Sequence, residues 1–288
     1  MAIVSVTINW GDGSANTVLT PPANTLIYPY SSSHTYTLTA TNTITVTAKD
    51  TNQLTGVASG QVAVAIGPTR VGLLAEYLFS GNYNDTSGNG KNLSSSGANI
   101  TYVTGVSAAD SVNQAVHFDN SGYIDGDASY LYNNSGWGYG NSSAAYTVSC
   151  WAKWDGSSGG SYGVLVQQLN APFLYNNAQK ITFGTGSTTL VQDTVSLVSG
   201  VWHNYAVTAT ALSGGSRTFT FYRDGTQVAQ ATKTDSSTYT AGSAGYLGGN
   251  SNGASTYDLV STAVDQVRLF NRALSAAEIA VLAQPQWP

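Results

Sequence analysis

Few side chains in this chain are placed to carry acid–base chemistry. Its 288 residues include two glutamates, Glu76 and Glu278, and most of its aspartates fall in Gly- and Asn-rich turns. Glu278 stands three residues after Ser275, the spacing of a helix capping box, which gives its carboxylate a structural role. Hydrolysis of a glycosidic bond takes two carboxylates roughly 5–10 Å apart, and no such pair stands on one face of an expected strand. We therefore predict a protein without catalytic residues.

Four aromatic residues in one Gly- and Asn-rich stretch, residues 129–141, are the best candidates for ligand binding. They are Tyr130, Tyr132, Trp137 and Tyr139. Aromatic rings can stack on sugar rings, so a glycan site is one interpretation. Tyr and Trp are also favoured anchors of protein–protein contacts, which is a second interpretation. In a third, the stretch folds back and covers its own domain.

The composition indicates an all-β protein with sizeable cores. Charged residues make up 9% of the chain, against a usual quarter, while β-branched and aromatic residues occur in short runs broken by Gly, Asn and Ser. The ten Lys and Arg residues are scattered and the net charge is −5, which argues against nucleic-acid binding. No apolar run is long enough to span a bilayer. Cys150 is the single cysteine, and its alternating surroundings predict a buried thiol.

The closing segment, residues 263–279, combines a strand and a short helix. We expect its strand to place Val264, Gln266, Arg268 and Phe270 on one face. The capping box at Ser275 then starts a helix, which Pro285 ends. This run resembles the end of laminin-G-like domains, which are concanavalin A-like jelly rolls.

The motifs before this segment follow the laminin-G-like order over residues 71–284. They are an opening strand, an Asp-x-Ser-Gly-Asn-Gly turn at Asp85, a Ser-x-Trp strand at Trp151, a Trp-His strand at His203 and a Tyr-x-Asp-Gly hairpin at Asp224. The resemblance implies a jelly-roll β-sandwich with a short C-terminal helix. Residues 285–288 would then form a tail.

Calcium is the cofactor that this resemblance implies. Members of the family often hold one structural Ca²⁺ with carboxylate, amide and carbonyl oxygens, the ligands that this ion prefers. Carried over to this sequence, the ligand candidates are Asp85, Asn89 and Asp265. In the alternative interpretation, Asp85 and Asn89 only form an Asx turn.

Residues 1–67 form a separate unit, joined by a linker at residues 68–70. Its Trp10-Gly11-Asp12-Gly13 turn, its His34-Thr35-Tyr36 and its long alternating strand resemble PKD domains, which are small immunoglobulin-like sandwiches. We expect Asp12 and His34 to fix turns. The unit is short for such a sandwich, so a sheet edge should be exposed, and we expect another subunit or the second domain to pair with it.

The expected function is recognition and assembly without catalysis. Met1-Ala2 leads directly into a strand with no secretion signal, and the chain cannot form an internal disulfide. These features favour a virion protein, such as a phage capsid decoration or fibre protein, whose N-terminal unit binds other virion proteins or copies of itself. The jelly roll would face outward and bind a glycan or a protein. The alternative is a secreted or cell-surface bacterial carbohydrate-binding or adhesin module.

Overall fold

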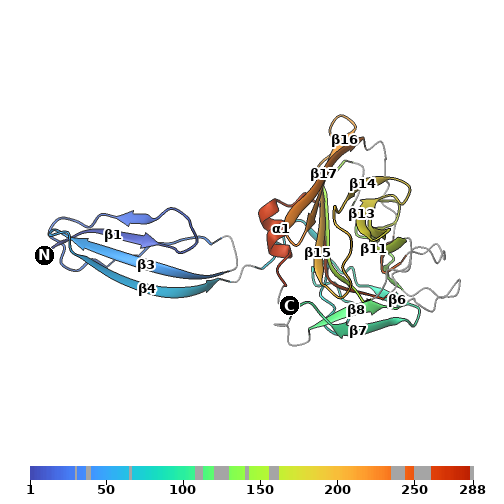
Figure 1. Cartoon of the computed structure of the whole chain (residues 1–288), viewed down its shortest axis with the longest axis horizontal. Coiled ribbons are helices and arrows are strands. Elements are labelled where there is room, and N and C mark those ends of the chain that lie inside the picture. Colours follow the sequence, from blue (N-terminus) through green and yellow to red (C-terminus); the bar gives the residue numbers. More distant parts are fainter. Residues whose placement is uncertain are drawn as a thin grey trace. The chain divides into compact units, whose positions relative to one another are not determined.

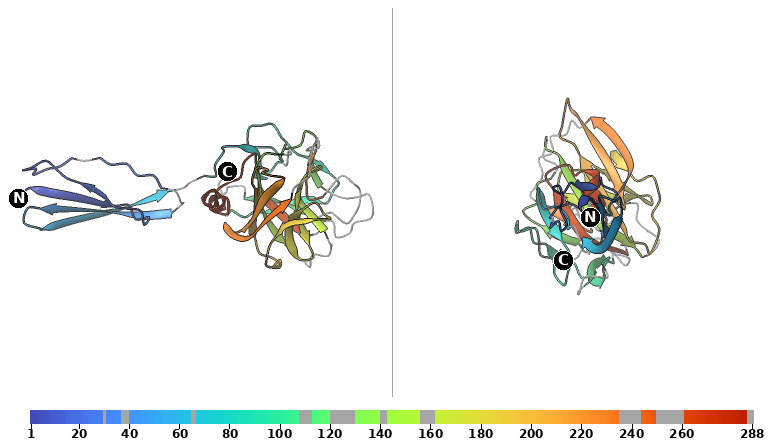
Figure 2. Two further views of the ribbon diagram at one scale, coloured as in Figure 1. Left: turned by 90° about the horizontal axis from the view of Figure 1, so that it is seen from above. Right: turned by 90° about the vertical axis from the view of Figure 1, so that its left-hand side faces the viewer.

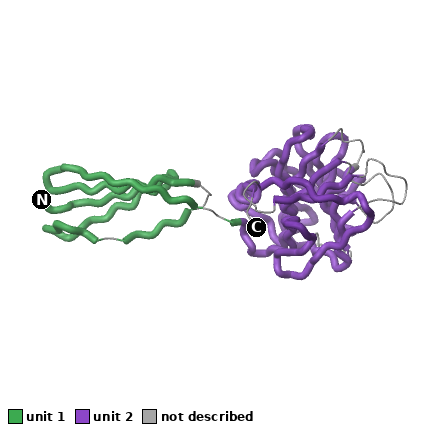
Figure 3. The backbone as a smooth tube through the Cα atoms, turned by 90° about the horizontal axis from the view of Figure 1, so that it is seen from below, with its two compact units in different colours: residues 1–67 green, residues 68–288 purple. Residues whose placement is uncertain are grey.

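The chain divides into two compact units, Met1–Gly67 and Pro68–Pro288 (Figure 3). Ser129, Gly140 and Asn141 of the aromatic stretch lie outside the described residues, as does the tail beyond Pro285. The computed structural model describes residues 1–29, 31–36, 40–64, 67–107, 113–119, 130–139, 143–155, 162–234, 244–249 and 261–285.

The first unit holds, within its described residues, one antiparallel sheet in the order β2-β1-β3-β4 (Figure 2). Val6 and Ile8 are buried on one face of this sheet, where they pair with Ala48 and Val46 of β3. The opposite face carries mostly Thr and Ser side chains. The strand bounds are Ile3–Asn9 (β1), Thr17–Leu19 (β2), Ala40–Asp50 (β3) and Thr55–Val64 (β4).

The second unit is a sandwich of two antiparallel sheets (Figure 1). We call the first the helix sheet; its order is β17-β16-β15-β10-β19-β8-β7, and β5 also pairs with β19. Its strands are Leu73–Tyr77 (β5), Ile100–Thr104 (β7), Gln114–Phe118 (β8), Tyr146–Trp154 (β10), His203–Ala209 (β15), Ser216–Arg223 (β16), Thr226–Thr234 (β17) and Thr262–Phe270 (β19).

We call the second the β9 sheet, with the order β14-β13-β12-β11-β18-β9-β6. The prediction of an all-β chain with a jelly-roll sandwich and one short helix is confirmed, while the PKD-like, immunoglobulin-like sandwich expected for residues 1–67 stays a prediction. The strands of the β9 sheet are Ser94–Ser96 (β6), Tyr130–Asn133 (β9), Tyr162–Gln168 (β11), Phe173–Asn177 (β12), Lys180–Gly184 (β13), Thr189–Gln192 (β14) and Gly245–Leu247 (β18).

The core lies between these two sheets, where alternate residues of each strand meet. Val148 and Cys150 of β10 face Leu174 and Phe183 of the β9 sheet within one apolar cluster. Burial also raises the pKa of the Cys150 thiol, which makes this cysteine unreactive.

A bulge in β19 changes which residues face this core. β10 pairs with β19 at Ser149↔Arg268 and next at Trp151↔Asp265, so β19 has one extra residue, and Gln266 has a φ of 44°. Val264 therefore shares the core with Val267 and Leu269, while Phe270 packs on the outer face. Arg268 and Phe270 lie away from the core, opposite Val267 and Leu269, as predicted. The prediction is wrong for Val264, which faces the core, because simple alternation does not continue through a bulge.

Helix α1 (Ala276–Leu282) covers part of the outer face of the helix sheet (Figure 1). Ile279 and Leu282 pack there against Ala206, Tyr222 and Phe270. The capping box is formed as predicted: Ser275 Oγ accepts from the Glu278 N–H, and the Ser275 N–H donates to Glu278 Oε2. Within the described ranges, no helix has the length and hydrophobicity of a membrane-spanning segment.

Candidate ligand-binding surface

Two of the four predicted aromatic contacts, Trp137 and Tyr139, lie in the core. Their exposed fractions are 2% and 1%. The Trp137 indole N–H donates to the Tyr77 hydroxyl at 2.7 Å, and its backbone N–H donates to Gln168 Oε1 at 2.6 Å. Gly245 makes room for the indole, because a Cβ there would lie 2.7 Å from two ring atoms of Trp137.

Tyr139 is held by the same buried glutamine. The Gln168 backbone N–H donates to the Tyr139 hydroxyl at 2.9 Å, and burial raises the pKa of that hydroxyl. Trp137 and Tyr139 therefore cannot contact a ligand at the surface. For these two residues the third interpretation holds, in which the stretch folds back on its own sandwich.

Tyr130 and Tyr132 lie on the outer face of the β9 sheet. Leu131 between them is buried in the core, so alternation turns both tyrosines outward, where they are half-buried. Their ring centroids are 6.0 Å apart, and the Tyr246 ring of β18 lies 5.8 Å from Tyr130. The three rings meet edge to face, and we call them the tyrosine cluster. Tyr246 is buried, so Tyr130 and Tyr132 are its exposed members.

The strands that carry the tyrosine cluster have no charged residue. Among the described strands of the β9 sheet, Lys180 of β13 is the one charged residue. Gln167 of β11 pairs in register with Tyr246, which in turn pairs with Tyr132. The Gln167 Oε1 atom is buried and has no hydrogen-bond partner among the described residues, so an amide acceptor lies in the same row as two of the rings.

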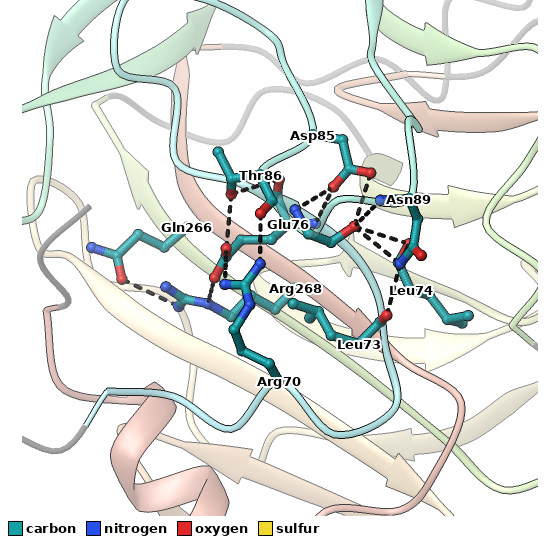
Figure 4. A network of polar contacts seen from close by, with 10 residues as sticks. Arg70, Leu73, Leu74, Glu76, Asp85, Thr86, Asn89, Gln266 and Arg268 are labelled. Atoms are coloured by element: carbon teal, nitrogen blue, oxygen red, sulfur yellow. Dashed lines mark hydrogen bonds and ion pairs between the residues drawn. The ribbon is translucent and has the colours of Figure 1, made fainter.

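The Asp85 turn is the second predicted site (Figure 4). Asp85 Oδ1 accepts from the backbone N–H groups of Glu76 and Ser87, at 3.0 and 2.9 Å. Asp85 Oδ2 accepts from the Ser87 hydroxyl and from the Lys91 backbone N–H, both at 2.9 Å. Each carboxylate oxygen thus has two donors inside the protein, and the bond from the Ser87 N–H is that of an Asx turn.

Asn89 points its amide NH₂ at two carbonyls of the opening strand. This group donates to Leu73 O at 2.9 Å and to Leu74 O at 3.2 Å. Asp85 and Asn89 therefore lock the turn onto β5 (Figure 4).

Asp265, the third predicted ligand, bonds elsewhere. Its Oδ2 accepts from the Val106 N–H at 3.0 Å, and its Oδ1 accepts from the Gln266 N–H at 2.7 Å. A calcium site needs oxygens free to point at one centre, and the bonded oxygens of Asp85 and Asp265 do not fit that requirement in this arrangement. In the described part of the chain, no three His, Cys, Asp or Glu side chains converge as a metal cluster. Calcium binding stays a prediction.

A buried ion-pair network that the sequence did not predict lies beside the Asp85 turn (Figure 4). Glu76 Oε1 accepts from Arg268 Nε at 2.8 Å, and Glu76 Oε2 accepts from Arg70 at 2.9 Å and from Thr86 at 2.8 Å. Burial would raise the pKa of Glu76, but the charge and hydrogen bonds of Arg268, with those of Thr86 and Arg70, lower it overall. One signal was present in the sequence: of the two glutamates, Glu278 is used by the helix capping box, whereas no local motif accounts for Glu76.

Two of the His–Asp pairs among the described residues tie turns to strands. His203 Nδ1 lies 2.7 Å from Asp224 Oδ2, while Asp224 Oδ1 accepts from the Asn204 N–H at 2.9 Å. In the first unit, His34 Nε2 lies 2.7 Å from Asp12 Oδ2, and the His34 ring stacks on Trp10. This agrees with the expectation that Asp12 and His34 fix turns.

The fold and the tyrosine cluster define a two-sheet jelly roll with an aromatic outer face. A laminin-G family model, described as the concanavalin A-like lectin/glucanases superfamily, matches residues 125–280. Because this match spans more than half of the chain, the chain belongs to that superfamily, and the predicted laminin-G-like family is confirmed. A search of curated proteins gave no match.

Solved structures with a similar fold include domains of larger enzymes and toxins. Domain 4 of AbnA, an extracellular arabinanase from Geobacillus stearothermophilus solved with arabinotriose, has a TM-score of 0.53 at 18% identity; the match covers 74% of this chain and 98% of that chain. The binding domain of Paraclostridial Mosquitocidal Protein 1 has a TM-score of 0.52 at 16% identity, covering 74% and 52%. A Trypanosoma rangeli sialidase has a TM-score of 0.54 at 19% identity, covering 77% and 33%. These identities indicate a shared fold alone.

Proposed function

We propose that the jelly roll is a non-enzymatic module that binds a neutral glycan on the outer face of the β9 sheet. The observation that carries this proposal is the tyrosine cluster: Tyr130 and Tyr132 present partly exposed rings beside Tyr246, on strands that carry no charge. Aromatic rings with a few polar groups nearby are the usual lining of ligand sites.

The charge pattern narrows the class of glycan. An acidic sugar would need Arg or Lys within hydrogen-bond reach, and the strands under the tyrosine cluster supply none. A neutral sugar ring instead buries its C–H face on an aromatic ring, while its hydroxyls bond to amide and hydroxyl groups. The arabinotriose bound to the AbnA domain is consistent with this class of ligand on this fold.

The test is binding of the whole protein to an array of neutral oligosaccharides, followed by calorimetry with the best ligand. We expect Tyr132→Ala to weaken that binding about tenfold, which corresponds to roughly 1.4 kcal/mol. Tyr102→Ala is the matched control, because Tyr102 is a half-buried tyrosine stacked on Tyr83 and belongs to the helix sheet. No binding by the wild type, or equal losses in the two variants, would refute the proposal.

The biological setting is proposed separately from the binding surface. A virion decoration or fibre protein and a secreted or cell-surface module would both display this face outward. Mass spectrometry of purified particles and of culture supernatant separates the two settings. Detection in particles supports the virion, whereas recovery only from supernatant or cell surface supports the alternative.

A further inference from the structure

Strand β4 is an unusually bare sheet edge. All ten of its residues pair with β3, from Ala40↔Val64 to Lys49↔Thr55, without a register shift. Its sequence, Thr-Gly-Val-Ala-Ser-Gly-Gln-Val-Ala-Val, contains no charged residue and no proline, and residues 55–61 are exposed. Natural proteins normally protect such an edge with a charge, a proline, a bulge or a covering segment. Among the described strands, only β3 pairs with β4.

The glycines of β4 point to a close neighbour outside the chain's own fold. Gly56 and Gly60 lie on the face that carries Val6 and Ile8, in rows with Ala48 and Ile44 of β3. Neither has a positive φ, and a Cβ on either would meet nothing within 4 Å. The conformation and packing of the unit therefore do not require glycine here. Glycine inside a strand often marks the close approach of another backbone.

We propose that β4 pairs with β4 of a second copy of this chain, in antiparallel orientation. A two-fold axis perpendicular to the sheet would join the two four-stranded sheets into one of eight strands. In this orientation the apolar face of Val6 and Ile8 continues into the same face of the copy, and the Thr-rich face does likewise. The arrangement is closed, because each copy uses up the long edge of its four-stranded sheet.

The composition of β4 favours a second copy as the occupant. Two identical uncharged strands meet no like-charge repulsion, and their ten residues give roughly 33 Å of pairing. The opposite edge of the sheet is a poorer partner, because β2 is three residues long. Such a dimer would also carry two jelly rolls, which strengthens binding to a repeated ligand.

Light scattering after size exclusion, over a series of protein concentrations, tests the proposal. Val57→Lys places a charge on the β4 edge, and Val18→Lys is its matched control at the opposite edge. Val18, Thr7, Thr47 and Val57 form one row across the sheet, and the exposed fractions of the two valines are 62% and 65%. We expect a wild-type dimer that Val57→Lys weakens at least tenfold and Val18→Lys leaves unchanged. A monomeric wild type at every concentration, or equal effects of the two variants, overturns the proposal.

A cross-linking experiment gives a readout that does not depend on a disruptive variant. Cys150 is the single cysteine and is fully buried, so Ser59→Cys adds the one accessible thiol near the middle of β4. Oxidation should give a covalent dimer of Ser59→Cys, and the same substitution at Val18 should give none. Equal cross-linking at the two positions contradicts pairing through β4.

Discussion

Replacing Glu76 by glutamine tests whether the network under the Asp85 turn is a buried ion pair. Glu76 and Arg268 are 3% and 2% exposed, and glutamine keeps the shape of Glu76 while removing its charge. Removing one partner of a buried pair leaves the other charge uncompensated, which typically costs about 3–5 kcal/mol. Gln266 Oε1, at 3.3 Å from Arg268 Nη1, is a neutral acceptor and cannot replace the carboxylate charge. We therefore expect Glu76→Gln to lower the free energy of unfolding by about 3–5 kcal/mol.

The control is Arg70→Gln in the same network. Arg70 also bonds to Glu76, but its side chain is 54% exposed, so its loss should cost about 1 kcal/mol or less. Urea unfolding followed by fluorescence measures both variants, because five of the six tryptophans belong to residues 68–288. A cost below about 1 kcal/mol for Glu76→Gln, or equal costs in the two variants, would refute the reasoning.

The pH dependence of the free energy of unfolding tests the same prediction in a second way. The pKa of Glu76 is lowered in the folded protein, so its contribution to stability is complete above the unfolded value of about 4.3. That contribution is lost as the pH falls through the lower folded value. The difference between wild type and Glu76→Gln should therefore shrink below about pH 4. A difference that stays constant down to pH 2 would show that the charge of Glu76 is not its source.

Two further predictions concern the sites expected from the sequence. Gly245→Ala should destabilise the jelly roll by about 1–3 kcal/mol in urea unfolding, because the new methyl group would overlap the Trp137 ring; a change below about 0.5 kcal/mol would contradict the close contact. At a free calcium concentration of 100 times Kd, a bound ion would add about 2.7 kcal/mol to the free energy of unfolding, which corresponds to roughly 5–10 °C in Tm. The predicted calcium site therefore requires that EDTA lower the Tm by several degrees and that added calcium restore it, whereas a shift below about 1 °C would support the Asx-turn interpretation, in which the oxygens of Asp85 are already bonded within the protein.

Local rules predicted the closing segment well and failed at one residue. The capping box joins Ser275 to Glu278, three positions apart, so the motif can be recognised from local sequence alone. The core-facing pattern of β19 follows from a bulge at Gln266, which depends on how β10 pairs with the strand. The alternation of apolar and polar residues does not reveal an extra residue in a strand. Glutamine is also not a residue type that indicates a positive φ, so nothing in the local sequence predicts the bulge.

The candidate ligand site was predicted only in part, for a related reason. The composition of residues 129–141 identified four aromatics, but it could not separate those that face outward from those that fold inward. The alternation of side chains along β9 turns Tyr130 and Tyr132 outward. Trp137 can pack in the core because Gly245, more than a hundred positions away, leaves room for its indole ring. The Glu76–Arg268 pair likewise joins residues 192 positions apart, which no local pattern encodes.

The residues that carry the family resemblance prove to be those that hold the fold together. Asp85 bonds its own turn, Asp224 fixes His203 and the Asn204 backbone, and Glu278 serves the cap of α1. A carboxylate already bonded to backbone N–H groups has little capacity left for a ligand, since its lone pairs are occupied. Chemistry specific to this chain should therefore lie outside those motifs. The tyrosine cluster and the β4 edge both lie outside those motifs. Tyr130 and Tyr132 have partly exposed rings, and β4 pairs on one side only among the described strands.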